Sequence, residues 1–225
     1  MIKAVVFDMF ETLVTHYRCP QYFGEDIAKD LNIDSNIFLD YWNSFEDDRT
    51  LGKINLENAL RTILQQNNIF SEKLLNQIVE KRKNIKRMCF QNISDEIMKV
   101  LDYLKENGIK IGLISNCFSE EAEVIKESEL YKYFSVCCLS YDMGIKKPDM
   151  RIFDECLNML GVQKCECLYI GDGGSKELEA SSTFGMRTFQ ATWFINEKSK
   201  QSKIKDGYRH LKNPLEIIEI IEAEK

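Results

Sequence analysis

The sequence contains 225 residues, 44% of them hydrophobic and 29% charged, with a formal net charge of −6 at pH 7. This length is sufficient for one large domain or for a core domain with a smaller companion. The acidic balance disfavours a nucleic-acid backbone as a partner, because no basic cluster offsets it. No apolar run is long enough for a signal sequence or a membrane span, so we expect a soluble, cytoplasmic protein without a membrane partner.

Eight cysteines lie mostly in apolar segments, without a CxxC pair or a His/Cys spacing typical of metal ligands. We therefore expect reduced thiols, most of them buried, in a reducing compartment.

The first predicted element is a short apolar run from Lys3 to Phe7 that ends in Asp8. Such a run is typical of a parallel strand that is buried on both faces. In open α/β sheets, ligands bind at the carboxyl ends of the strands. Asp8 is therefore a candidate for chemistry, and the alternative is a carboxylate that merely caps the following loop.

A block of helices follows, from about Pro20 to Gln91, in which apolar residues recur at helical spacing and no strand pattern occurs. We expect about four helices in this block. Its densest basic patch, Lys81-Arg82-Lys83 with Lys86-Arg87, is interpreted as one solvated helix face.

From Ser94 onward the pattern changes to alternating helices and strands, which predicts right-handed crossovers and a parallel sheet covered on both faces. The expected helices are 94–107, 119–129, 149–160, 175–184 and a terminal helix after Pro214. The expected strands are 109–114, 136–139, 167–170 and 187–190. The polar stretch 196–206 is expected to be a mobile loop.

Three of these strands are followed by polar residues of particular types. The strand 109–114 ends in Ser115-Asn116, which offers a hydroxyl and an amide to an oxyanion. The turn from Gly144 to Asp149 contains Lys146-Lys147-Pro148, in which the proline fixes the chain so that one lysine can be held inward. The strand 167–170 ends in a glycine-rich loop that contains Asp172 and Glu177. Each has an ordinary structural explanation, but four such ends on one sheet indicate a site.

Together and in this order, these segments resemble the motifs of the haloacid dehalogenase (HAD) superfamily over essentially the whole chain. The matching motifs are Asp8 with Thr12, Leu113-Ile114-Ser115-Asn116, Gly144-x-x-Lys147-Pro148-Asp149, and Gly171-Asp172 with Glu177. The resemblance implies an α/β fold with a Rossmann-like parallel sheet core, residues 1–14 and 93–225. It also implies an inserted all-α helical cap, residues 15–92, that closes over the site.

The resemblance further implies roles for individual residues. Asp8 would be the nucleophile, Lys147 would bridge it to the transferring group, and the Ser115 hydroxyl would hold that group's oxygens. Lys146 is the competing lysine. The candidate substrate-binding residues are Met9, Phe10, Arg49, Lys53 and Asn116.

A Mg²⁺ site is expected beside the nucleophile, because the carboxylates of Asp8 and Asp172 are hard oxygen ligands. By resemblance, the main-chain oxygen of Phe10 would be a further ligand. Glu177 would reach the metal through water or hold another ligand in place.

Two positions depart from the superfamily pattern. Its phosphatases usually carry a second aspartate two residues after the nucleophile, which protonates the leaving group, and here that residue is Phe10. The usual glycine of this motif is replaced by Glu11, which is a weak candidate for a displaced acid.

Four functions follow. The first is a Mg²⁺-dependent phosphohydrolase that acts through an aspartyl-phosphate on a small phosphorylated metabolite. The second is a metal-independent 2-haloacid dehalogenase, favoured by the aromatic residue at Phe10 and opposed by Asp172 and Glu177. The third is a phosphonate-cleaving hydrolase with Lys53 as the Schiff-base lysine. The fourth is a metal- or ligand-binding protein that has lost turnover. The sequence does not indicate an oligomeric state.

Overall fold

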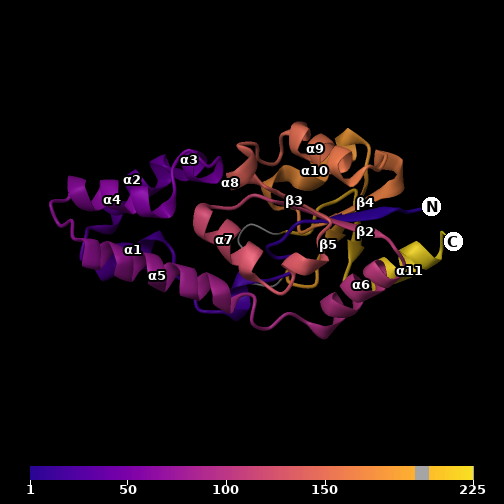
Figure 1. Ribbon diagram of the computed structural model, residues 1–225, viewed down its shortest axis with the longest axis horizontal. Coiled ribbons are helices and arrows are strands. Elements are labelled where there is room, and N and C mark those ends of the chain that lie inside the picture. Colours follow the sequence, from indigo (N-terminus) through magenta and orange to yellow (C-terminus); the bar gives the residue numbers. More distant parts are fainter. Residues whose placement is uncertain (196–202, 225) are drawn as a thin grey trace.

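The protein is described here from a computed structural model that covers residues 1–195 and 203–224. Its centre is a parallel sheet in the order β3-β2-β1-β4-β5-β6 (Figure 1). The strands are β1 (Ala4–Phe7), β2 (Lys110–Ser115), β3 (Val136–Leu139), β4 (Cys167–Gly171), β5 (Arg187–Ala191) and β6 (Arg209–Leu211). Strand β1 lies between β2 and β4, so the chain's first strand is central. The predicted α/β class with a parallel sheet is confirmed.

Both faces of the sheet are covered because side chains alternate along each strand. In β1, Val5 and Phe7 belong to one core cluster and Ala4 and Val6 to the other. The first cluster is completed by α6 (Asp95–Glu106), α7 (Ser119–Glu127) and α11 (Glu216–Glu222), and the second by α9 (Met150–Leu160) and α10 (Glu177–Phe184). Figure 1 shows α6 and α11 on one side of the sheet and α9 and α10 on the other.

The predicted elements of the second half of the chain are confirmed, with boundaries shifted by one or two residues in most cases. Helix α6 begins after Ser94, whose hydroxyl accepts the Ile97 amide, and α9 ends at Gly161 in the left-handed region. Strand β6 and the short helix α8 (Ser140–Met143) were not predicted. Most of the predicted loop 196–206 lies outside the described residues.

A helical segment separates β1 from the rest of the sheet. It contains α1 (Gly24–Leu31), α2 (Ser35–Ser44), α3 (Glu46–Thr50), α4 (Leu56–Gln66) and α5 (Glu72–Met88), one more helix than expected. The missed helix, α3, reads Glu-Asp-Asp-Arg-Thr and so has no apolar periodicity. The segment has its own apolar cluster, which includes Phe38, Leu60 and Ile78.

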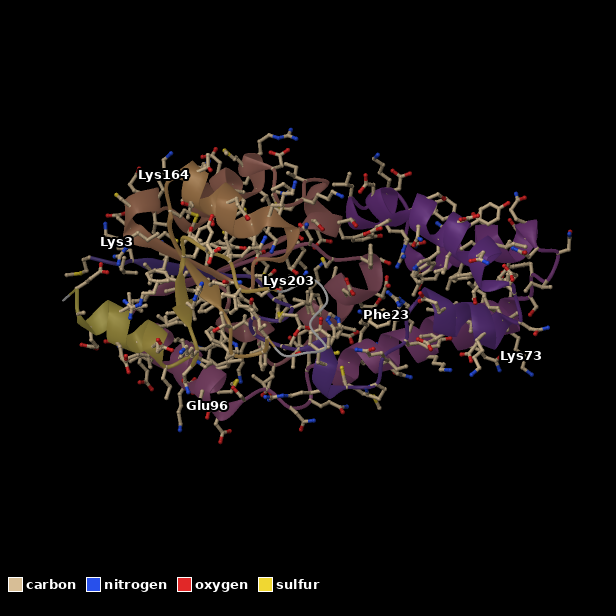
Figure 2. The ribbon with its side chains drawn as sticks, turned by 180° about the vertical axis from the view of Figure 1, so that it is seen from behind. Lys3, Phe23, Lys73, Glu96, Lys164 and Lys203 are labelled. Carbon is tan, nitrogen blue, oxygen red and sulfur yellow. The ribbon has the colours of Figure 1, made fainter. Side chains whose placement is uncertain are left out.

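The helical segment lies at the end of the molecule opposite both termini (Figure 1). In Figure 2, Lys73 marks this end and Lys3 and Lys164 mark the other. Within residues 1–195 and 203–224, no helix combines the length and apolar character needed to cross a membrane.

The basic patch of α5 packs against acidic residues of α7, so its interpretation as a solvated face was wrong. Arg82 and Lys86 are buried, and their nitrogens lie 2.6 Å from carboxylate oxygens of Glu120 and Glu121 respectively. Lys83 adds a bond of 2.8 Å to Glu123. Charge complementarity thus holds the helical segment on the sheet domain.

Glu120 is the centre of this interface. Its side chain is fully buried, and Oε1 accepts from Arg82 Nε at 2.6 Å and from Arg49 Nη2 at 3.0 Å. Burial raises the pKa of Glu120, but the charges of Arg82 and Arg49 outweigh burial and hold this pKa below its ordinary value.

We expect Glu120→Ala to lower the free energy of unfolding by about 3–5 kcal/mol, because it leaves two buried guanidinium groups without their anion. The matched control is Glu127→Ala. It removes a half-exposed partner of Arg87 on the same two helices and should cost about 0.2–1 kcal/mol. Urea titration measures both. Equal losses for the two variants would show that the buried cluster contributes nothing special.

Candidate active site

Asp8 follows β1 directly at the carboxyl edge of the sheet. Its amide donates to the Ile170 carbonyl of β4 at 2.9 Å, which continues the strand pairing and fixes the carboxylate beside the loop after β4. The residue is only 6% exposed. Asp8 Oδ1 accepts a hydrogen bond from Lys147 Nζ at 2.5 Å.

Lys147 is held inward by the turn before α9, as expected from Pro148. Its side chain is 2% exposed, and its main chain is fixed by the Asn116 amide. Asn116 Nδ2 donates to the Lys147 carbonyl at 2.9 Å, and the Lys147 amide donates to Asn116 Oδ1 at 2.8 Å. Lys146 instead forms an ion pair with Asp47 at the surface. The structure therefore brings Lys147 and not Lys146 to Asp8. Because both ends of its amide are engaged, Asn116 positions Lys147 rather than facing a substrate.

Glu177 begins α10 and turns back toward the sheet. Its Oε2 accepts from Lys147 Nζ and, at 3.0 Å, from the Tyr169 hydroxyl. Its Oε1 accepts the Gly173 amide at 3.2 Å. A Cβ on Gly171 would lie 2.2 Å from Oε1, so only glycine leaves room for this carboxylate.

Asp172 lies in the same loop. The Gly174 amide donates to its Oδ1 at 3.0 Å, and Gln190 Nε2 donates to its carbonyl at 2.7 Å. The loop's backbone thus holds the Asp172 carboxylate, and Gln190 of the neighbouring strand β5 holds its main chain.

Three carboxylates thus meet at one edge of the sheet: Asp8, Asp172 and Glu177 each offer an oxygen within 4.8 Å of the others. Burial and the negative charge of Glu177 raise the pKa of Asp8 well above its ordinary value, and Lys147 opposes this effect. The donor set consists of hard oxygens with excess negative charge, which fits Mg²⁺. The expected metal ligands Asp8, Asp172 and Glu177 are therefore brought together.

The side chains of two other expected site residues, Ser115 and Met9, are buried. Ser115 is fully buried at the end of β2, and its hydroxyl makes one long contact, 3.5 Å, to the Asn116 carbonyl. The Met9 side chain is 0% exposed and packs in the core of the sheet, so only its main chain can face a ligand.

Phe10 packs against His16 with ring centroids 4.5 Å apart, and its edge faces Phe90. Glu11 occupies the left-handed region, with φ of 59°, which explains why glycine is usual there. Its carboxylate accepts from the Thr15 hydroxyl at 2.5 Å and the His16 amide at 2.9 Å. Glu11 therefore stabilises its own loop, and the structure gives no support for it as a displaced acid.

His16 is also fully engaged. Its Nδ1 lies 3.4 Å from Glu11 and its Nε2 lies 3.0 Å from Lys86 Nζ. Burial and the charge of Lys86 lower the pKa of His16, so the ring is neutral at pH 7 and a poor general acid.

The two expected substrate ligands of the helical segment do not join this group. Arg49 is 1% exposed, stacks between Trp42 and Phe118 and pairs with Glu120, so it joins the helical segment to α7. Lys53 is exposed and pairs with Asp48, which raises its pKa. A Schiff-base lysine needs a lowered pKa, so this ion pair does not favour that chemistry, and the role of Lys53 stays a prediction.

Sequence reasoning missed Tyr169 and Gln190, which orient Glu177 and Asp172. Both are fully buried within strands. A polar side chain in an otherwise apolar strand was the available signal, because such a group must find a partner inside.

Comparison with known proteins identifies a matching family and several relatives of this chain. The model of a family described as haloacid dehalogenase-like hydrolase matches residues 2–185. A glyceraldehyde 3-phosphate phosphatase of Methanocaldococcus jannaschii is 24% identical over 84% of each chain. The phosphatase of the same name from Methanopyrus kandleri is 28% identical, but the match spans 41% of this chain and only 40% of that relative.

Solved structures share the fold at low sequence identity. A 2-haloacid dehalogenase from Pseudomonas syringae pv. Tomato has a TM-score of 0.71 at 20% identity, with all of both chains covered. A HAD family enzyme from Bacteroides thetaiotaomicron, in complex with magnesium and inorganic phosphate, has a TM-score of 0.61 at 16% identity, covering 88% of this chain and 98% of that one.

We expect Lys147→Met to lower the free energy of unfolding by about 3–5 kcal/mol, because Asp8 and Glu177 lose their shared cation. Lys146→Met is the matched control on the neighbouring residue, where a surface pair is lost at a cost of about 0–1 kcal/mol. Chemical denaturation in the presence of chelator measures both. If both losses are small, Lys147 is not what holds the carboxylates together.

Proposed function

The chain belongs to the haloacid dehalogenase-like hydrolases, and from this premise we propose that it is a Mg²⁺-dependent phosphohydrolase acting through an aspartyl-phosphate at Asp8. The observation that carries the proposal is the convergence of Asp8, Asp172 and Glu177, with oxygens within 4.8 Å of one another. A dehalogenase has no need of this acidic group, because halide displacement by a carboxylate requires no metal.

The chemistry follows from the contacts of Asp8. Lys147 holds Oδ1, which leaves Oδ2 to attack phosphorus while the bond from phosphorus to the leaving oxygen breaks. Water then hydrolyses the aspartyl-phosphate, and inorganic phosphate and free Asp8 result. A Mg²⁺ ion held by Asp8, Asp172 and the Phe10 main-chain oxygen would supply the positive charge that lets two anions approach. Glu177 holds Lys147, whose ammonium offsets charge on the nucleophile and on the transferring group.

We propose that residues 15–92 form a cap over this site. Contacts between the helical segment and the core support this role: the Leu56 amide of α4 donates to the Ser119 hydroxyl at 2.9 Å, and Arg49 reaches Glu120. A Cβ on Gly52 would lie 2.0 Å from the Tyr141 carbonyl, so the loop after α3 touches the core closely. These contacts bring the cap against the segment that follows Ser115 and Asn116.

The substrate class follows from the surroundings of Phe10. Glu11 and His16, the two nearest candidates for a replacement acid, are engaged in the loop, and His16 is neutral. The enzyme therefore favours phosphorylated metabolites whose leaving group needs little protonation, such as acyl phosphates. The two archaeal relatives named as glyceraldehyde 3-phosphate phosphatases support a small phosphorylated substrate in general.

The second candidate function is 2-haloacid dehalogenase, favoured by the aromatic side chain at Phe10. In that reaction Asp8 attacks carbon, the carbon–halogen bond breaks, and no proton is needed by the departing halide. The acids Asp172 and Glu177 speak against it.

A substrate panel tests both functions. Phosphate esters, acyl phosphates and 2-haloacids are assayed with Mg²⁺ and with chelator, on the wild type and on Asp8→Asn. We expect Mg²⁺-dependent phosphate release that the variant loses by about 10³-fold or more, because the isosteric amide cannot attack. Halide release that persists in chelator would establish the dehalogenase instead.

Phe10→Asp tests the missing acid. We expect it to raise hydrolysis of alkyl phosphates about tenfold or more relative to acyl phosphates, since only the former need a proton on the leaving oxygen. Phe10→Asn is the matched control. Its side chain has the size of aspartate and loses the same ring contact with His16, but it has no proton to transfer. Rates are compared at saturating Mg²⁺. Equal changes in the two variants would assign Phe10 a packing role only.

A further inference from the structure

The chain passes twice between the core and the cap, and each passage carries a cysteine. Cys19 lies on the outgoing passage, after the short 3₁₀ turn His16–Arg18, and Cys89 ends α5 on the returning one. Their sulfur atoms lie 2.6 Å apart although the residues are 70 positions apart in sequence. Both cysteines are free thiols.

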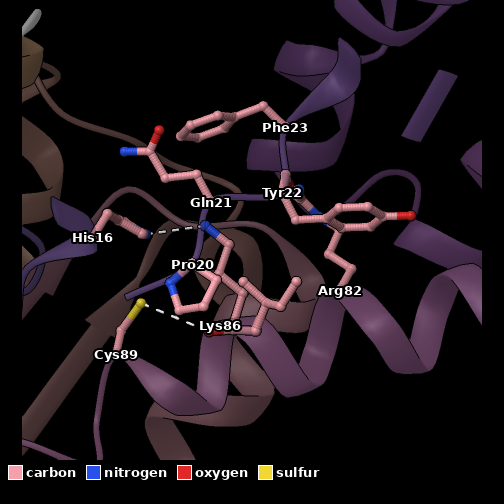
Figure 3. Close-up of a pocket in the computed structure, with 9 residues that line it drawn as sticks. His16, Pro20, Gln21, Tyr22, Phe23, Arg82, Lys86 and Cys89 are labelled. Carbon is pink, nitrogen blue, oxygen red and sulfur yellow. Dashed lines mark hydrogen bonds between the residues drawn. The ribbon is translucent and has the colours of Figure 1, made fainter. Parts of the chain in front are cut away.

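Cys89 borders a small pocket at this junction (Figure 3). Cys89 lines the pocket together with His16, Pro20, Gln21, Tyr22, Phe23, Arg82, Ile85 and Lys86. Cys89 is 7% exposed, whereas Cys19 is partly exposed and so can be reached from solvent. Cys19 is therefore the more exposed residue of the two.

We propose that Cys19 and Cys89 are an oxidation site, at which a peroxide converts the two thiols to a disulfide that ties the two passages together and so restricts the movement of the cap relative to the core.

The reaction balances with hydrogen peroxide as the two-electron oxidant. The Cys19 thiolate attacks one peroxide oxygen, the O–O bond breaks, and sulfenic acid and hydroxide form. The Cys89 thiol gives its proton to that hydroxide, and its sulfur attacks the Cys19 sulfur and expels a second hydroxide. That hydroxide takes up the proton that Cys19 lost at the start. The products are one disulfide and two waters.

The order of attack agrees with the surroundings of the two sulfurs. The hydrogen bond from Cys89 lowers the pKa of Cys19, and burial opposes this only in part. Lys86 lowers it further, as a cation stabilises a thiolate. The same hydrogen bond and burial raise the pKa of Cys89. Cys19 is thus the attacking thiol and Cys89 the resolving one.

The two sulfurs are adjacent in the arrangement in which α5 forms its ion pairs with α7. A disulfide between them would therefore favour this arrangement over others. Helix α5 carries Arg82 and Lys86, which bind Glu120 and Glu121 of the core. In this arrangement Asp8 is only 6% exposed, and with residues 15–92 as its proposed cap, substrate exchange requires the cap to move. This consequence for turnover rests on the proposed function, whereas the disulfide itself does not.

The chain contains its own controls. Cys138 and Cys156 also interact through their thiols, but both are 0% exposed inside the core. Cys165 is exposed and belongs to neither pair. Cys165 thus controls for an exposed thiol outside the two pairs, and Cys138 with Cys156 controls for a thiol pair that solvent does not reach.

The test treats the full-length protein with graded hydrogen peroxide and maps disulfides by peptide mass spectrometry. We expect a Cys19–Cys89 link in the wild type and in Cys165→Ser, and none in Cys19→Ser, whose partly exposed position tolerates serine. The link should reverse with dithiothreitol, while Cys138 and Cys156 stay reduced. Oxidation of Cys165 without any Cys19–Cys89 link would overturn the proposal.

Hydrogen exchange then tests the effect on the cap without a substrate. We expect slower amide exchange in α5 and α7 of the oxidised wild type, by several-fold, and no change in Cys19→Ser. A Cys19–Cys89 disulfide without slower amide exchange would refute the proposal that it restricts the movement of the cap. With an active substrate, turnover should fall several-fold on oxidation and recover with dithiothreitol. Disulfide mapping and hydrogen exchange do not depend on turnover. Both measurements would therefore stay valid if the phosphohydrolase proposal failed.

Discussion

The structure depends on bringing three carboxylates to one edge of a sheet and keeping them there. Two unit charges 4.8 Å apart repel by about 3.5 kcal/mol at an effective dielectric constant near 20. The fold opposes this repulsion with Lys147, which binds Asp8 and Glu177 at once. Much of the surrounding sequence serves that contact: Asn116 fixes the lysine's main chain, and Gly171 leaves room for Glu177. The remaining excess of negative charge is what makes the site suited to a divalent cation.

A second set of charges joins the helical segment to the sheet domain. An apolar interface would hold this segment by buried area alone, whereas α5 and α7 meet through Arg82, Lys86, Glu120 and Glu121. Buried ion pairs contribute little net free energy, because desolvation offsets much of their attraction, but they strongly favour one geometry over its neighbours. The helical segment can therefore leave the sheet domain at modest cost and return to a single position. This property would suit the cap role proposed above for residues 15–92.

The sequence predicted the sheet and the acidic site well, because both rest on local patterns. Apolar runs that end in Asp8, Ser115 and Asp172 mark strand ends, and parallel strands bring those ends to one edge. It failed where partners are distant in sequence. The basic patch of α5 looks solvated until α7 is placed against it, and Arg49 looks like a substrate ligand until Glu120 is known to face it. Helix α3 has no apolar stripe that the sequence could reveal. The ion pair of Arg49 and the contacts of the following loop hold this helix in place instead.

The loop after β1 explains why its two departures from the usual motif occur together. Glu11 adopts a left-handed conformation that favours glycine, and bonds from Thr15 and His16 to its carboxylate compensate for the strain. The bond to the His16 amide places His16 beside position 10, where the Phe10 ring stacks on the imidazole. Phe10 thus fits the loop that Glu11 creates. The Phe10 ring and the Glu11 carboxylate both contact His16, so the two departures from the usual motif share one partner.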